Sequence, residues 1–82
     1  MTEVTSIDER LHTIVHASLG PIGDKMKPES RFHEDLNADS LDMIQITMDI
    51  EESFDIDITD SEAANVKTVG DALALIRAKT EG

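Results

Sequence analysis

The chain has 82 residues, no cysteine, and 18 acidic against 7 basic side chains, which gives a formal net charge of −11. This length fits one small domain over residues 1–82, and the missing cysteine excludes a disulfide framework, a zinc finger and a cysteine nucleophile. The negative charge argues against nucleic acid and membrane surfaces as partners. The sequence has no long apolar run and no signal-peptide layout, so we expect a cytoplasmic protein. We also expect it to be a monomer.

The first predicted helix covers residues 6–19. Ser6 and Glu9 have the spacing of a capping box, and apolar residues recur on one face of this segment at helical spacing. Gly20 followed by Pro21 predicts the end of the helix, because glycine favours a helix C-terminus and proline cannot continue the helix.

A long ordered loop is predicted over residues 20–38, where glycine, proline and serine occur and no hydrophobic period is sustained. Loops of this length in a compact domain are uncommon and are usually functional. The predicted anchors of the loop in the core are Met26, Phe32 and Leu36.

The second predicted helix runs from the N-cap residue Asp39 to Phe54 and carries two apolar stripes. The longer stripe contains the aromatic residue and is the predicted core face; it consists of Met43, Ile46, Ile50 and Phe54. The shorter stripe consists of Leu41, Ile44 and Met48. We expect this stripe to stay partly exposed as a binding strip, although a widened core covered by the long loop is the alternative.

An extended connector and two further helices complete the predicted fold. Ile56 and Ile58 alternate with aspartates, and we expect both isoleucines to turn inward. A short helix is predicted over residues 59–64 and a last helix over residues 69–79. The expected buried stripe of the last helix consists of Val69, Ala72, Leu73 and Ile76. The fold class is all-α: a small antiparallel bundle of three main helices and one short helix, with a long loop between helices one and two.

The whole net charge falls in the central segment of the chain. Between Phe32 and Val66 there are eleven acids and no lysine or arginine; the acids are Glu34, Asp35, Asp39, Asp42, Asp49, Glu51, Glu52, Asp55, Asp57, Asp60 and Glu62. A segregated charge of this kind suits a basic protein partner, which it attracts over long range. An acidic surface that only improves solubility is the alternative.

No motif in the sequence predicts catalysis. There is no Gly-x-Ser-x-Gly turn, and no spacing gives a catalytic role to His12, His16 or His33. His12 and His16 share a helix face, but a metal site there would need a third ligand, so we expect both at the edge of a solvated face. The acidic run 55–62 lacks the central glycine and the remaining ligands of a calcium-binding loop, so no metal site is predicted.

Ser40 stands at the predicted start of the second helix, within the segment Glu-Asp-Leu-Asn-Ala-Asp-Ser-Leu-Asp (residues 34–42). Unpaired backbone N–H groups and the positive end of the helix dipole favour an attached phosphate at such a position. On these grounds alone Ser40 is a plausible part of a helix cap and nothing more.

Residues 34–42 resemble the phosphopantetheine site of bacterial acyl carrier proteins, and the resemblance extends through residues 51–58 and 68–72. It implies that Ser40 carries a covalent 4′-phosphopantetheine arm, added from coenzyme A by a phosphopantetheinyl transferase. It also implies a non-catalytic protein that carries acyl chains as thioesters on this arm between the enzymes of fatty acid or related lipid biosynthesis. We expect the loosely packed aliphatic bundle to shelter the acyl chain between these enzymes.

The resemblance implies roles for the neighbours of the serine. Asp39 and Leu41 flank the attachment position. The positions implied to dock acyl-transferring and chain-elongating enzymes, which present basic patches, are Asp42, Ile44, Met48, Glu51 and Glu52. These residues include two members of the shorter apolar stripe that the helical spacing leaves exposed.

Four positions depart from the family pattern. Asn37 stands where glycine is usual, Gln45 replaces an acid, Asp49 replaces a small apolar residue, and Thr59 stands where proline is frequent. Asparagine tolerates a left-handed turn, so the attachment site stays credible. The departures leave open a dedicated carrier for a polyketide, a special lipid or an aminoacyl group, and an acidic helical adaptor without a prosthetic group is the remaining alternative.

Overall fold

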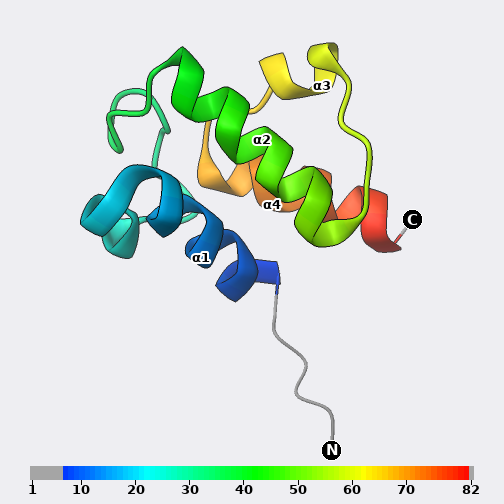
Figure 1. The fold of residues 1–82 in the computed structure, drawn as a ribbon, viewed down its shortest axis with the longest axis horizontal. Helices are drawn as coiled ribbons and strands as arrows, with labels where there is room; N and C mark the ends of the chain where they lie inside the picture. The colour runs from blue at the N-terminus through cyan, green and yellow to red at the C-terminus, as the bar shows by residue number, and fades with distance from the viewer. Residues whose placement is uncertain (1–6, 82) are drawn as a thin grey trace, which may run out of the picture.

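A computed structural model describes residues 7–81 as a set of helices joined by loops (Figure 1). The elements in chain order are α1 (Ile7–Leu19), the 3₁₀ helix η1 (Gly20–Lys25), α2 (Ser40–Phe54), α3 (Asp60–Ala64) and α4 (Val69–Glu81). No helix in residues 7–81 is both long and apolar enough to cross a membrane. Ser6, the predicted N-cap of the first helix, lies outside the described residues.

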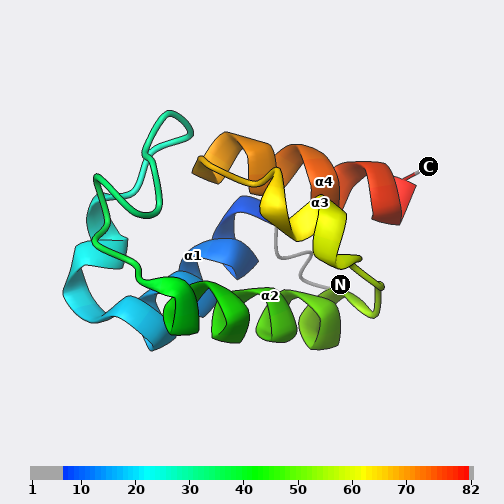
Figure 2. The same ribbon diagram turned by 90° about the horizontal axis from the view of Figure 1, so that it is seen from above.

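The three long helices pack with α1 running opposite to α2 and α4 (Figures 1 and 2). The short α3 lies on the other side of the α2–α4 pair from α1, and the long loop joins α1 to α2 at one end of the bundle. The predicted all-α bundle of three main helices and one short helix, with a long loop between the first two, is therefore confirmed.

Side-chain caps fix the starts of three helices. At α2, the Asp39 carboxylate accepts the N–H of Asp42 at 2.8 Å, and the Asp42 carboxylate accepts the N–H of Asp39 at 3.1 Å. At α3, Thr59 and Glu62 form the same reciprocal capping box. Since each cap satisfies backbone donors that the helix leaves unpaired, the starts of α2 and α3 follow directly from the local sequence.

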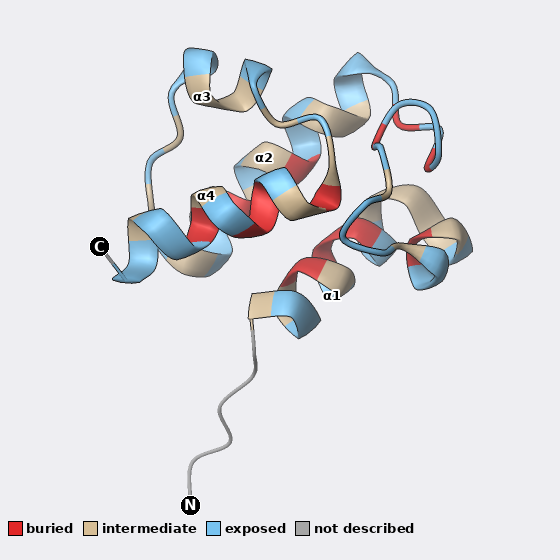
Figure 3. Cartoon of the chain, turned by 180° about the vertical axis from the view of Figure 1, so that it is seen from behind, coloured by how far each residue is buried: buried red, intermediate tan, exposed pale blue. Residues whose placement is uncertain are grey.

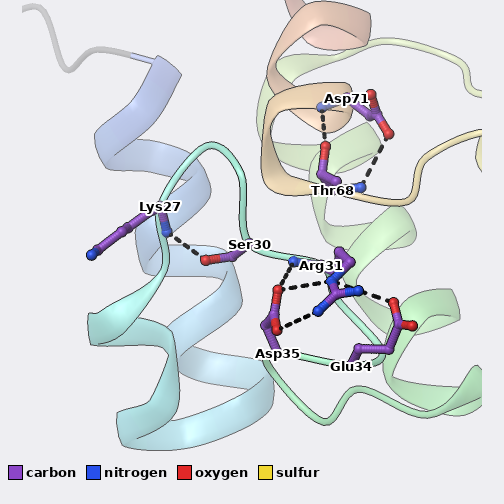
Figure 4. Close-up of polar contacts among 7 residues, drawn as sticks. All are labelled: Lys27, Ser30, Arg31, Glu34, Asp35, Thr68 and Asp71. Atoms are coloured by element: carbon purple, nitrogen blue, oxygen red, sulfur yellow. Dashed lines mark hydrogen bonds and ion pairs between the residues drawn. The ribbon is translucent and has the colours of Figure 1, made fainter.

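The start of α4 is held by Asp71 and Thr68, as Figure 4 shows. The Asp71 carboxylate accepts the N–H groups of Lys67 and Thr68 at 3.0 and 3.1 Å, and the Thr68 hydroxyl accepts the N–H of Asp71 at 3.1 Å. The backbone hydrogen bonds, that from Lys67 first, lower the pKa of the Asp71 carboxyl below its ordinary value. The ionised carboxylate is thus part of the cap.

The core lies where the three long helices and the loop meet (Figure 3). Its buried residues are Leu11, Ile14, Val15, Phe32, Leu36, Ala38, Ile46, Ile50, Val69, Ala72, Leu73 and Ile76. The predicted stripe of the last helix and the central residues of the longer stripe of α2 are all among them, while Met43, Phe54, Ile56 and Ile58 are partly buried against the core. The predicted core faces of α2 and α4 are confirmed.

The long loop is more regular than its sequence indicates. Its first six residues form η1, so the prediction of a loop throughout residues 20–38 is wrong for this stretch. Gly20 takes a left-handed φ of 81°, and the fixed φ of Pro21 suits the first turn of a helix. Gly23 then lies against the backbone of α1, where a Cβ atom would stand 3.0 Å from the Cα of His16. These are packing constraints that hydrophobic spacing does not reveal.

The rest of the loop is held by Phe32 and Leu36, which are buried, and by contacts around Arg31. The Arg31 guanidinium donates to both carboxylate oxygens of Asp35 at 3.1 and 3.2 Å, and lies 3.5 Å from Glu34 (Figure 4). The hydrogen bonds from Arg31 lower the pKa of the Asp35 carboxyl. Phe32 and Leu36 are confirmed as anchors, and Met26 is partly buried against the core.

Arg10 joins α1 to the C-terminal end of α2. Its guanidinium donates to the backbone carbonyl of Ser53 and, at 3.0 Å, to the Ser53 hydroxyl. The guanidinium carbon also lies 4.1 Å from the centroid of the Phe54 ring, which is a cation–π geometry. One residue of the first helix therefore fixes the last turn of α2 by three contacts.

Candidate functional site

Ser40 is the first residue of α2, and its side chain is exposed. The preceding turn is formed by Asn37, with a left-handed φ of 59°, and by Ala38, which is buried and whose N–H donates to the Phe32 carbonyl at 2.8 Å. The cap of α2 is made by Asp39 and Asp42, and no hydrogen bond occupies the Ser40 hydroxyl within residues 7–81. A capping role for this hydroxyl is thus not observed, and its oxygen is free for a covalent attachment.

The shorter stripe of α2 lies on the surface. Leu41, Ile44 and Met48 are 75%, 56% and 49% exposed, and they are the exposed large hydrophobic residues among those described. The alternative of a widened core covered by the long loop is therefore wrong. Asp42 and Glu52 lie beside the stripe on the same helix, so α2 presents an apolar strip with acidic neighbours.

A cavity of about 420 Å³ lies between α2 and α3. Its apolar wall includes Met43, Ile58, Ala63 and Val66, and Ser40 is part of its lining. The aliphatic part of this wall suits an alkyl chain, because apolar surface is stabilised by leaving water, while the rest of the lining is polar and includes Thr47 and Glu51. The serine therefore adjoins a partly apolar space.

The sequence of the chain matches that of known proteins over most of its length. A family model described as "Phosphopantetheine attachment site" covers residues 9–76. The chain is 49% identical over 70 residues to an acyl carrier protein of Helicobacter hepaticus, and the aligned region covers 85% of this chain and 92% of that protein. It is 42% identical over 77 residues to an acyl carrier protein of Akkermansia muciniphila, and here the aligned region covers 94% of this chain and 95% of that protein.

The chain belongs to the acyl carrier protein family. Members of this family are non-catalytic and bear a 4′-phosphopantetheine on which acyl chains are carried in fatty acid biosynthesis. The predictions of the family, the cofactor and the carrier role are confirmed at this level. The alternative of an adaptor without a prosthetic group is set aside by the match to the attachment-site family.

Two of the predicted docking acids of this acyl carrier have structural contacts, since Asp42 belongs to the capping box of α2 and Glu51 contacts the connector after it. The Glu51 carboxylate accepts the N–H of Ile58 at 2.9 Å, and the Glu51 carbonyl accepts the N–H of Ile56 at 3.1 Å. Glu51 therefore holds the connector between α2 and α3 in the position that turns its two isoleucines inward. The sequence does not reveal this contact, because it depends on the chain reversing direction after Phe54. Glu52, by contrast, is exposed.

The departures from the family pattern are accommodated locally. Asn37 adopts the left-handed turn that glycine would provide. The Gln45 amide donates to the Asp49 carboxylate at 2.9 Å, so these two departures contact one another on α2. Thr59 caps α3 through Glu62.

His12 and His16 meet a third residue that sequence reasoning missed. One oxygen of the Asp24 carboxylate lies 2.9 Å from His12 Nε2 and 3.1 Å from His16 Nδ1. Partial burial raises the pKa of the Asp24 carboxyl, but its hydrogen bonds with His16 and His12 and their charges lower it more, so the net pKa is reduced. Among the described residues, no group of three or more histidine, aspartate or glutamate side chains has an arrangement suited to a metal ion. The three residues tie η1 to α1.

Proposed function

We propose that Ser40 is the residue that carries the 4′-phosphopantetheine arm. The observation that supports this most is the exposed hydroxyl at the first residue of α2, which takes no part in the cap and adjoins the cavity between α2 and α3. Asp39 and Leu41 flank it; Asp39 fixes the start of the helix, and Leu41 presents an apolar surface beside the arm. The exposed hydroxyl of Ser40, with Leu41 beside it, therefore fits a covalently attached phosphopantetheine arm.

The carrier function is divided between the arm and this chain's own residues. When bound, the arm supplies a terminal thiol that holds the acyl group as a thioester. The chain fixes the origin of the arm through the Asp39–Asp42 capping box, so that the attachment oxygen has a defined position at the end of a rigid helix.

The cavity between α2 and α3 is the proposed shelter of the acyl chain. Its apolar lining by Met43, Ile58, Ala63 and Val66 supports this, since an alkyl chain that leaves water for such a space is stabilised by about 0.8 kcal/mol per buried CH₂. Isotope-labelled holo and acylated protein should therefore differ in the resonances of these residues. Unchanged cavity resonances on acylation would show that the chain stays in solvent.

The exposed strip of α2 is the proposed docking surface. Ile44 and Met48 provide apolar contact, and Asp42, Glu51 and Glu52 provide negative charge for partners with basic patches. The proposed partners are a phosphopantetheinyl transferase and the acyl-transferring and chain-elongating enzymes. Fatty acid or related lipid biosynthesis in the cytoplasm is the proposed setting, and the names of the two relatives support an acyl cargo over an aminoacyl one.

Intact-mass measurement tests the attachment. The purified chain is incubated with coenzyme A, Mg²⁺ and a broad-specificity phosphopantetheinyl transferase, and we expect the wild type to gain the mass of one phosphopantetheine. Ser40→Ala should gain none. Ser61→Ala is the matched control, because Ser61 is exposed on α3 and should leave the modification intact. A mass gain that persists in Ser40→Ala, or no gain in the wild type, contradicts the proposal.

A further inference from the structure

Two basic residues line the cavity that Ser40 adjoins. These residues are Lys67 and His33, and the cavity wall also includes the acids Glu51 and Asp60. The lysine is notable because the chain between Phe32 and Val66 contains eleven acids and no lysine or arginine. Lys67 is the first lysine after this acidic segment, and the fold returns it to the cavity beside the serine.

Backbone hydrogen bonds hold Lys67 beside the cavity. The N–H of Phe32 donates to the Lys67 carbonyl at 3.0 Å, and Arg31 and Thr68 form an isolated antiparallel bridge. These contacts join the segment before α4 to the loop that precedes α2. The position of Lys67 is therefore set by the fold, although its side chain is exposed.

His33 forms the neighbouring part of the same wall. Its Nδ1 lies 2.6 Å from the carbonyl oxygen of Ala38, and since a carbonyl oxygen can only accept, Nδ1 is the donor. This bond connects the imidazole to the turn that leads into α2. Lys67 and His33 thus lie on two chain segments that are joined by a backbone hydrogen bond, and both line the cavity that Ser40 adjoins.

The ammonium group of Lys67 is available for a ligand. The lysine and arginine side chains that form ion pairs among the described residues are Arg31, Arg77 and Lys79. Lys67 is not among them; its backbone N–H caps α4 through Asp71, and its charge attracts that carboxylate without forming an ion pair within 4 Å. An exposed lysine has a flexible four-carbon stem and three donors, so it can follow a nearby anion.

We propose that Lys67 binds the phosphodiester group of the arm, and that His33 forms the wall on which this group rests. The inference rests on the proposed attachment at Ser40. Attachment places a new negative charge beside Asp39 and Asp42, which repel it, and a nearby ammonium offsets that repulsion. Lys67 is accordingly a positioning residue: it favours arm conformations that enter the cavity over those that extend into solvent.

Phosphorus NMR of the holo protein tests this inference, because the arm carries a single phosphorus atom and its phosphodiester does not titrate near neutral pH. Each sample is first shown by intact mass to carry one phosphopantetheine. We expect the ³¹P resonance of Lys67→Gln to shift and to relax more slowly than that of the wild type, since the phosphate loses a contact. Lys67→Arg should retain most of the wild-type behaviour, because it keeps the charge.

Lys25→Gln is the matched control, since Lys25 is an exposed lysine of η1 and does not line the cavity. An identical ³¹P shift and relaxation rate in the wild type and in Lys67→Gln would overturn the inference, as would equal changes in Lys67→Gln and Lys25→Gln. In either case the measured mass gain would leave the attachment at Ser40 standing. A wild type that gains no mass would instead contradict the proposed function.

Discussion

The two faces of α2 have similar side chains and opposite environments. Ile46 and Ile50 face α1 and α4 and are 1% and 5% exposed, whereas Ile44 and Met48 lie on the other side and are about half exposed. Hydrophobicity does not distinguish the two faces, since isoleucine occurs on both. What differs is the surroundings: one face is covered by helices, and the other adjoins the cavity, the serine and the acidic segment. One face stabilises the fold, while the other is exposed and is the proposed docking surface.

The isoleucine pair provides the largest expected contrast. Ile46→Ala should destabilise the domain by about 2–5 kcal/mol, because it leaves a cavity in the core, and this approaches the whole stability of a small domain. Ile44→Ala should change the free energy of unfolding by less than about 0.5 kcal/mol. Urea denaturation followed by circular dichroism measures both. The rate of arm transfer to the folded Ile44→Ala protein should fall about tenfold, as for a loss of 1–2 kcal/mol at a docking contact.

Equal destabilisation by the two substitutions would mean that the exposed strip is part of the core in solution. An unchanged transfer rate in Ile44→Ala would remove this residue from the docking surface of the transferase.

The adjacent glutamates give a smaller contrast on the acidic side. Glu51→Ala should destabilise the domain by about 1 kcal/mol, because the N–H of Ile58 loses its acceptor. Glu52→Ala should leave the stability within about 0.5 kcal/mol, since this side chain is exposed. Thermal melts of both variants at low and high salt measure the difference. If both variants melt together, the contact of Glu51 with the connector adds nothing to stability.

The smallest expected effect concerns the cap of α4 and depends on pH. Because hydrogen bonds lower the pKa of the Asp71 carboxyl in the folded state, its contribution to stability is present above the unfolded pKa of about 4 and is lost as the pH falls through the lower folded value. Asp71→Asn should therefore lower the melting temperature at pH 7 and approach the wild type at strongly acidic pH. A difference that stays constant down to acidic pH would exclude the ionised carboxylate as its source.

The sequence predicts α2 well because its determinants are local. The Asp39–Asp42 cap and both stripes lie within one helix, and the structure has them as the spacing predicts. The sequence does not predict the contacts of Asp24 and Glu51 or the lining of the cavity. Each of these joins segments that are distant in the chain or separated by a turn. Hydrophobic periodicity and capping rules predict where a helix begins and which of its faces is apolar, but not which other helix or loop that face contacts.

The place of Ser40 at the start of α2 likewise follows from a local motif, and the fold explains what surrounds it. The family resemblance indicated the serine and its flanking residues, but neither the resemblance nor the spacing indicated that Lys67 would line the same cavity. That placement depends on the pairing of residues 31–32 with residues 67–68, which no period in the sequence encodes.

The contacts of Arg10 hold one end of α2 against α1. The clamp on Ser53 and Phe54 lies at the C-terminal end of the helix, and Ser40 lies at the other, about 20 Å away for fifteen residues at 1.5 Å each. The helix α3, in contrast, has five residues, none of them buried. We therefore expect the cavity to widen for a longer acyl chain by displacement of α3, while α2 keeps its place. Amide hydrogens of α3 should accordingly exchange faster than those of α2. The wall that adapts to the acyl chain would then be separate from the helix that is proposed to bind partner enzymes.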